Sequence, residues 1–323
     1  MTRYGYLLPT RGIVDASPDA ETLAARVESE VLGLARRAET LGYSHAWIGD
    51  SVLAKPRLEP LSTLAAVAAE TDAIELGTAV YLPTLRHPVH VAHLTATVDQ
   101  LSGGRLALGV GVGRREAVRR EYENLGLTYN RRGARMDETL AVLDRLWSGE
   151  AVDYDGDFIA IEEASIGFGP VRNPPIYIPT SAPDPGEEIP EPLLDRLATY
   201  GDGWLPNWCS PETYAAGLEQ VHAALEAADR DPDALDAAYY MDVAIGDDEA
   251  AAIETAREFY EAYYPGLNDL SDAEVRGRGT FGSAAMVAET LEAYARAGVE
   301  TMVVRFATTN QRVQLARFSD LID

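Results

Sequence analysis

The sequence predicts an α/β protein of the TIM (β/α)8 barrel class, with insertions. Two observations predict it. Short apolar segments alternate with longer helical patterns along the whole chain, and eight such apolar segments occur in its 323 residues. Most of these segments are continuous apolar runs, as buried parallel strands are. Eight β–α units in a chain of this length favour one barrel domain over residues 1–323, with a doubly wound sheet as the alternative.

The first half of the chain alternates four predicted strands with helices. A helix is predicted from Asp19 because apolar residues recur every three or four positions until Gly42, which ends it. A second amphipathic helix over 131–147 carries one apolar stripe, which we interpret as core or subunit contact. The stripe consists of Met136, Leu140, Leu143 and Trp147. Strands are predicted over 4–9, 44–50, 74–82 and 105–113, and further helices over 60–70 and 89–101.

The second half repeats this alternation. Strands are predicted over 176–181, 203–206, 237–245 and 301–306. Helices are predicted up to residue 200, over 211–228, 248–263 and 284–297, and from residue 311. Two segments interrupt the pattern and are interpreted as insertions: 150–175, which holds a hairpin-like stretch over 152–160, and the polar 264–282. Active sites of barrels lie at the carboxyl ends of the strands, so each insertion is either a substrate-recognition loop or a surface excursion.

The charge of the chain restricts its partners. It has 52 acidic and 27 basic residues, a net charge of −25 and a pI near 4.5. Such a chain repels nucleic acid and anionic membranes. The acids are spread along the sequence, which is typical of a halophilic surface; a specific cation-binding role is the alternative. No apolar run approaches the roughly 18 residues of a membrane span, and no apolar signal region precedes the first strand, so we expect a cytoplasmic protein.

Metal and Schiff-base chemistry have little support in the composition. Cys209 is the single cysteine, so an intrachain disulfide and a thiolate-clustered metal site are excluded. The five histidines are scattered and form no H-E-x-x-H motif, so no metal site is expected. Lys55 is the only lysine and is placed in a loop, which argues against a barrel aldolase or lyase.

A glycine-rich stretch, "DQLSGGRLALGVGVG" (99–113), runs through the fourth predicted strand. Its spacing, Gly109-x-Gly111-x-Gly113, lacks the third glycine of a dinucleotide fingerprint because position 114 is Arg, and no Walker motif follows. Glycine within a strand commonly marks close approach by a ligand or by another backbone. Both explanations, clearance for a flat ligand and tight packing inside the barrel, remain open.

Several motifs together resemble the bacterial luciferase-like family of flavin- and deazaflavin (F420)-dependent oxidoreductases. They are "LSGGRLALGVGVG", "AETLGYSHAWIGDS", "LAAVAAETDAIELGTAVYLPTLRHPVHVAH", "RRGARMDETLAVLDRLW", "NPPIYIPTS" and "YGDGWLPN". Their order and spacing carry the resemblance, which is dense from about residue 20 to 207. It implies a TIM barrel and hydride transfer between a small organic substrate and F420 or FMN at the carboxyl ends of the strands.

The resemblance also implies cofactor-binding positions. The cofactor ring is expected against Thr78, Ala79, Val80 and Tyr81, where members often carry a non-prolyl cis peptide, and beside Gly111 and Gly113. The phosphate is expected at Thr180, Ser181 and Ala182, where the following helix adds its dipole. The closing residues of the pocket are expected to be Asp202, Gly203 and Trp204.

Two departures from the family pattern bear on the chemistry. The paired glycines that many relatives carry after the fifth strand are replaced by Ile178-Pro179-Thr180-Ser181, so hydroxyls are expected to replace part of the phosphate cradle. Ser51 stands where relatives commonly have a histidine that assists oxygenation. We therefore favour an F420-dependent reductase or dehydrogenase similar to methylene-tetrahydromethanopterin reductases. The alternatives are an FMN-dependent monooxygenase that uses O2 and a non-catalytic flavin-binding relative.

Three residues are candidate catalytic groups, namely Asp50, Ser51 and Arg305. Asp50 ends the second strand and either orients cofactor or substrate, or pairs with a nearby arginine. Arg305 lies in the last strand and either binds a phosphate or acidic substrate, or pairs with a buried carboxylate. His87 is expected to support the turn into the helix over 89–101. Trp204 and Trp208 are interpreted as stacking groups of the pocket or as core, and a homodimer is expected.

Overall fold

The computed structural model describes residues 1–113, 116–180, 187–264 and 266–322. Eight parallel strands form a closed barrel in the order β11-β1-β2-β3-β4-β7-β8-β9, and β9 pairs with β11 to close it. This confirms the barrel, and the doubly wound alternative is wrong. The strands are β1 (Arg3–Leu7), β2 (His45–Ile48), β3 (Glu75–Tyr81), β4 (Leu106–Val110), β7 (Ile176–Ile178), β8 (Gly203–Trp204), β9 (Asp236–Ile245) and β11 (Thr301–Phe306).

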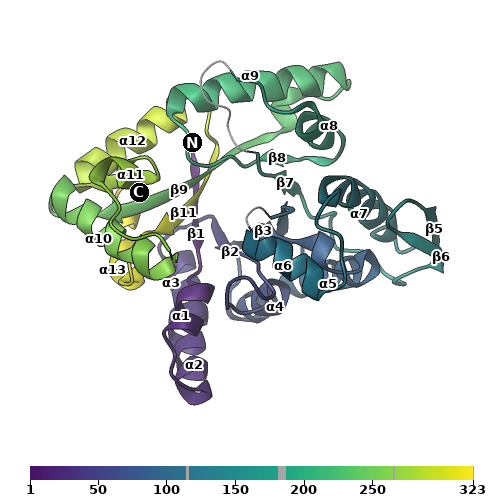
Figure 1. Cartoon of the computed structure of the whole chain (residues 1–323), viewed down its shortest axis with the longest axis horizontal. Coiled ribbons are helices and arrows are strands. Elements are labelled where there is room, and N and C mark those ends of the chain that lie inside the picture. The colour runs from purple at the N-terminus through teal and green to yellow at the C-terminus, as the bar shows by residue number, and fades with distance from the viewer. Residues whose placement is uncertain (114–115, 181–186, 265, 323) are drawn as a thin grey trace.

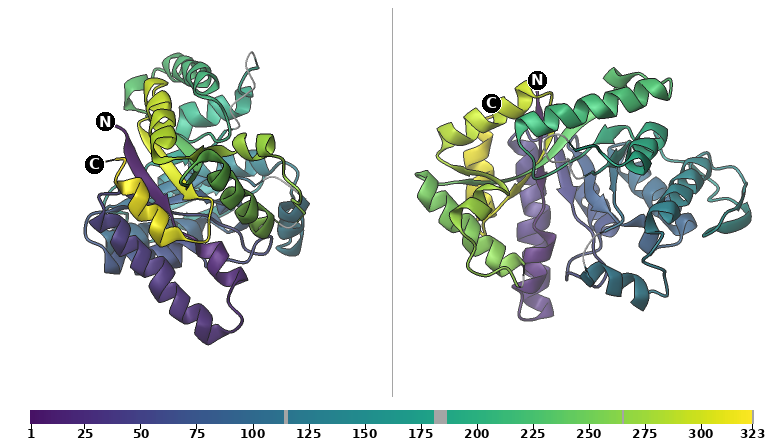
Figure 2. Two further views of the ribbon diagram at one scale, coloured as in Figure 1. Left: turned by 90° about the vertical axis from the view of Figure 1, so that its left-hand side faces the viewer. Right: turned by 45° about the horizontal axis from the view of Figure 1, so that its top comes forward.

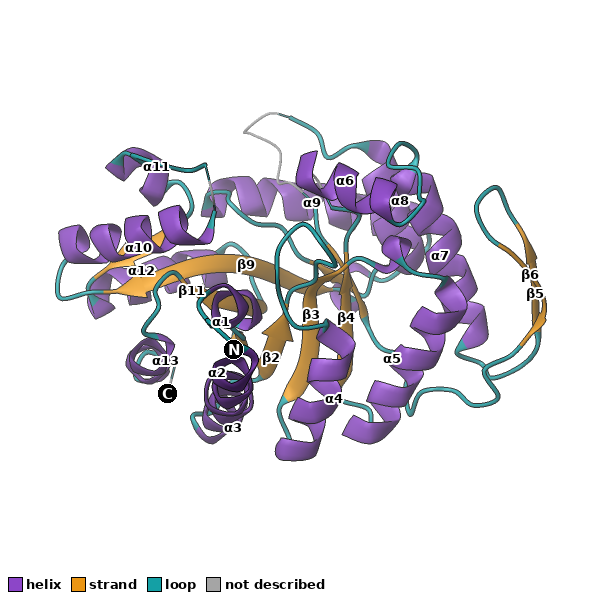
Figure 3. Cartoon of the chain, turned by 60° about the horizontal axis from the view of Figure 1, so that its bottom comes forward, coloured by secondary structure: helices purple, strands orange, loops and turns teal. Residues whose placement is uncertain are grey.

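The helices lie outside the strands (Figures 1 and 3). They are α1 (Thr10–Asp15), α2 (Ala20–Arg26), α3 (Gly33–Thr40), α4 (Pro60–Glu70), α5 (Pro88–Ser102), α6 (Glu116–Asn124), α7 (Arg132–Leu146), α8 (Glu191–Tyr200), α9 (Pro211–Ala227), α10 (Glu249–Tyr263), α11 (Asp272–Arg276), α12 (Ala284–Arg296) and α13 (Gln311–Ser319). A π-helical segment, η1 (Val27–Leu32), joins α2 to α3, so the helix predicted from Asp19 to Gly42 is three consecutive segments. Helices α1, α6 and α11 were not predicted.

Both predicted insertions have structure of their own. Residues 150–175 contain the antiparallel hairpin β5 (Val152–Asp155) and β6 (Ala160–Ala164), which projects at one edge of the molecule (Figure 3). Residues 264–282 contain α11 and β10 (Gly279–Gly282), and β10 pairs with the second half of β9 while β8 pairs with the first half. Strand β9 is ten residues long, which allows it both neighbours.

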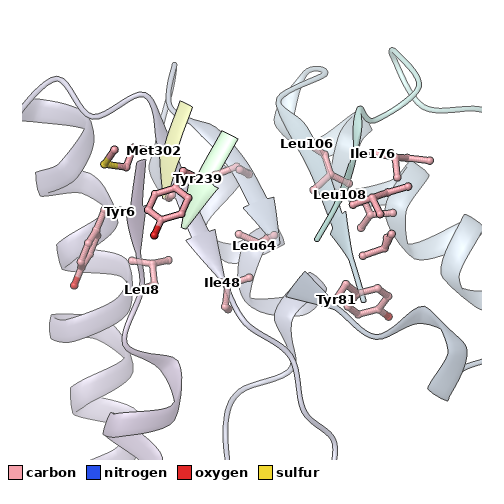
Figure 4. Close-up of a cluster of buried hydrophobic side chains, with 14 of the residues drawn as sticks. Tyr6, Leu8, Ile48, Leu64, Tyr81, Leu106, Leu108, Ile176, Tyr239 and Met302 are labelled. Atoms are coloured by element: carbon pink, nitrogen blue, oxygen red, sulfur yellow. The ribbon is translucent and has the colours of Figure 1, made fainter. Parts of the chain in front are cut away.

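Side chains pack both inside the barrel and between its strands and the surrounding helices. Trp47 lies across the lower interior, where a Cβ on Gly5 or Gly77 would come within 2.3 or 2.1 Å of its ring. Outside the barrel, Leu106, Leu108 and Ile176 lie together in the core that the helices cover (Figure 4). The stripe Met136, Leu140, Leu143 and Trp147 is buried in this core, which decides between the two interpretations in favour of core.

The first half of the glycine-rich stretch is the turn from α5 into β4. Gly103 and Gly104 both have positive φ, +70° and +87°, which glycine adopts at little cost. Asp99 is fully buried and accepts from the backbone N–H groups of Leu106, Val171 and Arg172 at 3.4, 2.7 and 3.2 Å. Arg105 donates five hydrogen bonds to Ser102 and to the end of α4 and the start of β3.

The chain ends lie near each other in both views of Figure 2. None of the helices in the described part of the chain combines the length and the apolar character that crossing a membrane would require.

Replacing Arg105 with lysine is expected to lower the free energy of unfolding by at least about 2 kcal/mol, because one ammonium cannot reach the carbonyls of Ala68, Thr71, Ile74 and Ser102 together. Urea unfolding in concentrated KCl measures the change. Arg296→Lys is the control, since the side chain of Arg296 is 68% exposed and pairs with Glu292 at 3.4 Å. Equal losses in the two variants would contradict the role given to Arg105.

The buried His45 is expected to make the free energy of unfolding fall at acidic pH. Burial, with smaller contributions from Arg3 and Arg172, lowers the pKa of His45 from 6.5 to about 3. Between these values the unfolded chain binds a proton that the folded chain does not, so this stabilising contribution is lost as the pH falls below 6.5. His45→Gln is expected to reduce the fall in unfolding free energy between pH 6.5 and 5 by about 2 kcal/mol. The free energy of unfolding is measured against pH for both proteins. An equal fall between pH 6.5 and 5 in the wild type and in His45→Gln would refute this prediction.

Candidate functional site

A cavity of about 920 Å³ opens at the carboxyl ends of the barrel strands. Its lining includes the last residues of β1, β4 and β7 and the segments that follow β2, β3, β4, β7 and β8. Tyr240 of β9 and Arg305 of β11 complete it. Ligand sites of barrels lie on this face, so we take the cavity as the candidate site.

The end of β3 bulges into the cavity next to strand β4. The pairing of β3 with β4 shifts between Thr78 and Tyr81, and the Ala79–Val80 peptide bond is cis. Ala79 and Val80 line the cavity, whereas Thr78 and Tyr81 are fully buried behind it. The Thr78 hydroxyl donates to the carbonyl of Gly109 at 2.8 Å. Of the four residues predicted against the ring, the structure places two in the cavity.

The glycines of β4 and the segment after it make room for this bulge. A Cβ on Gly109 would lie 2.1 Å from the carbonyl oxygen of Thr78, and one on Gly111 would lie 2.6 Å from Cγ2 of Val80. Gly111 and Gly113 also line the cavity. The structure supports the packing explanation, because Gly109 and Gly111 admit the bulge of β3. Clearance for a flat ligand remains a prediction, and the bulge and Gly111 together line the floor of the cavity.

The predicted phosphate loop is only partly described. Thr180 lines the cavity, is 5% exposed, and accepts at 2.7 Å from the indole N–H of Trp204. Ser181 and Ala182 lie outside the described residues. Trp204 is fully buried and packs on Tyr214 of α9 with ring centroids 4.9 Å apart, so it lies one layer behind the cavity and positions Thr180.

Asp202 and Gly203 are not brought to the cavity. Asp202 accepts from the N–H of Ile176 at 2.9 Å, which places it at the amino ends of β7 and β8, the opposite end of the barrel. A Cβ on Gly203 would meet the ring of Tyr177 at 2.3 Å. The expectation that these two residues close the pocket is therefore wrong, because the motif "YGDGWLPN" enters strand β8 from below. Trp208 lies beyond the strand, is 39% exposed, and lines the cavity.

Asp50 pairs with Arg86, which is the second of the two roles considered for it above. Its side chain is fully buried and accepts from both Nη atoms of Arg86, at 2.6 and 3.1 Å, and from the N–H of Leu82 at 2.9 Å. Asp50 thereby joins the ends of β2 and β3 beneath the cavity. His87, next to Arg86, accepts from the N–H of Val89 and caps α5, as predicted.

Ser51 belongs to a loop organised by a residue that the sequence analysis missed. Glu121 of α6 is 1% exposed, and its Oε1 accepts from Ser51 Oγ and from the N–H groups of Val52, Leu53 and Ala54. Its Oε2 is buried without a partner in the described structure, and Glu121 lines the cavity. The only available signal was a carboxylate beside the aromatic Tyr122 in an arginine-rich segment.

Arg305 pairs with a buried carboxylate, the second of its two alternatives. Its Nε lies 2.6 Å from Oδ1 of Asp242, and its Nη1 donates to the hydroxyl of Tyr264 at 2.8 Å. Burial opposes the charge, but Asp242 outweighs it and raises the pKa of Arg305 well above its ordinary value. Tyr240 faces the cavity beside this pair, and burial raises its pKa well above 10, so its phenol stays protonated.

Neither a reactive thiol nor a metal site is found in the described part of the chain. Burial raises the pKa of the Cys209 thiol to about 12, which leaves it unreactive at neutral pH. Among residues 1–113, 116–180, 187–264 and 266–322, no group of three or more histidine, cysteine or acidic side chains could hold a metal ion.

Comparison with known proteins shows extensive similarity. The model of the family described as luciferase-like monooxygenase matches residues 2–301. The chain is 31% identical over 220 residues to the 5,10-methylenetetrahydromethanopterin reductase of Archaeoglobus fulgidus, a match that covers 68% of this chain and 61% of that protein. The matched part thus spans about three fifths of this curated relative's length.

Solved structures share the fold across the whole chain. An F420-dependent secondary alcohol dehydrogenase, in complex with an F420–acetone adduct, superposes with a TM-score of 0.80 at 18% identity, covering 99% of this chain and 98% of that one. A monooxygenase from Streptomyces bottropensis superposes with a TM-score of 0.81 at 21% identity, covering 99% and 98%.

Removing the Glu121 carboxylate is expected to release the loop that follows β2. In Glu121→Ala the N–H groups of Val52 and Leu53 lose a charged acceptor worth about 1.5–3 kcal/mol, so their amide exchange should accelerate by about 10- to 100-fold. Glu116→Ala, in the first turn of the same helix, is the control because Glu116 is 67% exposed. Unchanged exchange at positions 52 and 53 would contradict the assignment.

Proposed function

Because the chain belongs to the luciferase-like monooxygenase family, we propose that it is an oxidoreductase that binds F420 or FMN in the cavity. Hydride passes between this cofactor and a small organic substrate. The observation that carries the proposal is the floor of small residues where Ala79 and Val80 meet Gly111, at the carboxyl ends of the strands. A floor without large side chains admits a wide ring system, and about 920 Å³ is room for both the ring and a substrate.

The described residues fit such a group. Ala79, Val80 and Gly111 line the cavity with small or apolar side chains, against which a ring can lie. Thr180, held by the indole of Trp204, offers a hydroxyl to a phosphate. When bound, the ring supplies the hydride chemistry; the chain supplies binding, orientation and the exclusion of water. Tyr240, kept protonated by burial, holds a phenolic proton at the cavity wall beside the Arg305–Asp242 pair.

F420 is the favoured cofactor. Ser51, in place of a histidine, has its hydroxyl engaged by Glu121, so it provides no base for oxygen chemistry. The similarity to a methylenetetrahydromethanopterin reductase supports the same choice. The alternative is an FMN-dependent monooxygenase. The Streptomyces bottropensis monooxygenase has the same fold, but this similarity does not extend to cofactor or activity. A non-catalytic flavin-binding relative would keep the cavity and lack turnover.

Three further features belong to the proposal. We place the protein in a cytoplasm rich in salt, because its net charge of −25 repels itself at low ionic strength. We treat residues 1–323 as a single domain with its two insertions, and we expect a homodimer.

The first experiment titrates the protein with F420 and with FMN in concentrated KCl, followed by cofactor fluorescence. At least one cofactor is expected to bind with Kd below about 100 μM, which corresponds to roughly −5.5 kcal/mol. Preference for F420 supports the reductase, and preference for FMN supports the monooxygenase. Absence of binding by both would refute the proposal.

Replacing Gly111 with valine is expected to weaken cofactor binding at least about tenfold, or roughly 1.4 kcal/mol. The new side chain would push Val80, only 2.6 Å from the added Cβ, into the cavity floor. Gly277→Ala, at the exposed end of α11, is the control because the nearest atom to its Cβ lies 3.6 Å away. The measurement is the same fluorescence titration, with circular dichroism to verify folding. A folded Gly111→Val variant with wild-type affinity would show that the floor does not contact the cofactor.

A further inference from the structure

Arg57 is a cation in the cavity wall whose guanidinium has no partner among the described residues. It lies in the loop after β2, lines the cavity, and its Nε is buried without a hydrogen bond. No hydrogen bond or ion pair joins its guanidinium to any residue in the described parts of the chain. The other cavity arginines have partners: Arg305 and Arg196 pair with Asp242 and Asp137, and Arg132 donates to the carbonyl of Gly113 at 3.1 Å.

The fold makes room for this side chain. Nη1 of Arg57 lies against Gly49, directly after β2, so that a Cβ on Gly49 would come within 2.2 Å of it. The same Cβ would lie 3.7 Å from the carbonyl oxygen of Ala79. The guanidinium therefore lies against Gly49 at the end of β2, on the side of the cavity where Ala79 begins the floor.

Asp50 and Oε1 of Glu121, at this end of β2, have partners other than Arg57, whereas Oε2 of Glu121 has none in the described part of the chain. Asp50, the next residue after Gly49, is held by two bonds from Arg86 and one from Leu82. Oε1 of Glu121 accepts from the backbone of the loop over residues 52–54. In a chain with nearly twice as many acids as bases, an arginine left unpaired at a cavity is an exception.

Arg57 lies at the edge of the proposed cofactor site, on the β2 side of the bulge in β3 and away from β4 and β7. The cofactor position Val80 lies in β3, and Gly111 and Thr180 follow β4 and β7, the next strands in the order of the barrel. Arg57 follows β2 and belongs to the other part of the wall, which Tyr240 and Arg305 continue. A guanidinium binds carboxylate and phosphate oxygens through paired, charge-assisted hydrogen bonds.

We propose that Arg57 anchors an oxyanion of the substrate, so that the site takes a small molecule bearing a carboxylate or phosphate group. This rests on the proposed function for the presence of a cofactor beside it. Binding through Arg57 holds the substrate's anionic end over β2 and its remainder toward the floor formed by Ala79 and Val80. Tyr240 then lies on the same side of the cavity as the bound substrate.

The test titrates the full chain with inorganic phosphate, and separately with acetate, at constant ionic strength in KCl. Binding is followed by ³¹P and ¹H line broadening, with and without cofactor. The wild type is expected to bind at least one probe saturably in both states. Arg57→Gln should bind at least tenfold more weakly, and Arg57→Lys should fall between, because it keeps the charge without the fork. Arg37→Gln is the matched control, since the Nε of Arg37 is likewise buried without a partner but lies outside the cavity.

The affinity of Arg57→Gln for the cofactors shows whether Arg57 binds an oxyanion of the substrate or of the cofactor. Arg57→Gln is expected to bind F420 and FMN within twofold of the wild type. A tenfold loss of cofactor affinity, or loss of probe binding once the cofactor is bound, would assign the oxyanion to the cofactor and overturn the proposal. Failure of the wild type to bind either probe would also overturn it. Arg57-dependent probe binding without any cofactor binding would refute the proposed function instead and leave the oxyanion site standing.

Discussion

Strand β4 passes directly under a bulge in β3, and this close approach is the constraint on which the site depends. The bulge brings the carbonyl oxygen of Thr78 to a place that a Cβ on Gly109 would occupy. Any larger residue at 109 would separate the strands, break the hydrogen bond from Thr78 to Gly109, and withdraw Ala79 and Val80 from the cavity. Strand β4 thus has no side chain at position 109, and this allows β3 to form the floor of the site.

Around this floor two pairs of opposite charges are buried together. Asp50–Arg86 and Asp242–Arg305 are buried pairs that join neighbouring strands, β2 to β3 and β9 to β11. Breaking such a pair leaves an uncompensated charge, so both arginines are fixed in place rather than available to a ligand. Arg57 stands outside this scheme, which is why it, and not Arg305, carries the recognition of an anion.

The sequence was sufficient for elements with strong periodicity or clear ends and insufficient elsewhere. Helix α4 was predicted with its observed bounds because Pro60 opens an apolar pattern that ends before Thr71. Helix α6 was missed because its arginine-rich surface hides a short buried face with Glu121 at its centre. Residue type cannot show which partner a charged side chain chooses, so both alternatives for Arg305 stayed open until β9 placed Asp242 beside it. For Trp204, strand β8 has two residues and offers no alternation from which its side could be read.

The contrast between surface and cavity has a consequence for binding. A surface with a net charge of −25 repels an anionic ligand over distances set by the ionic strength. The screening length is about 10 Å at 0.1 M salt and about 3 Å at 1 M, so concentrated salt removes the long-range repulsion. Short-range contacts inside a partly buried cavity are screened much less, and the bidentate fork of an arginine gains more there than a solvated lysine would. An acidic exterior and an arginine-bearing cavity are therefore compatible in salt, and the affinity for an oxyanion is set at Arg57 rather than by the overall field.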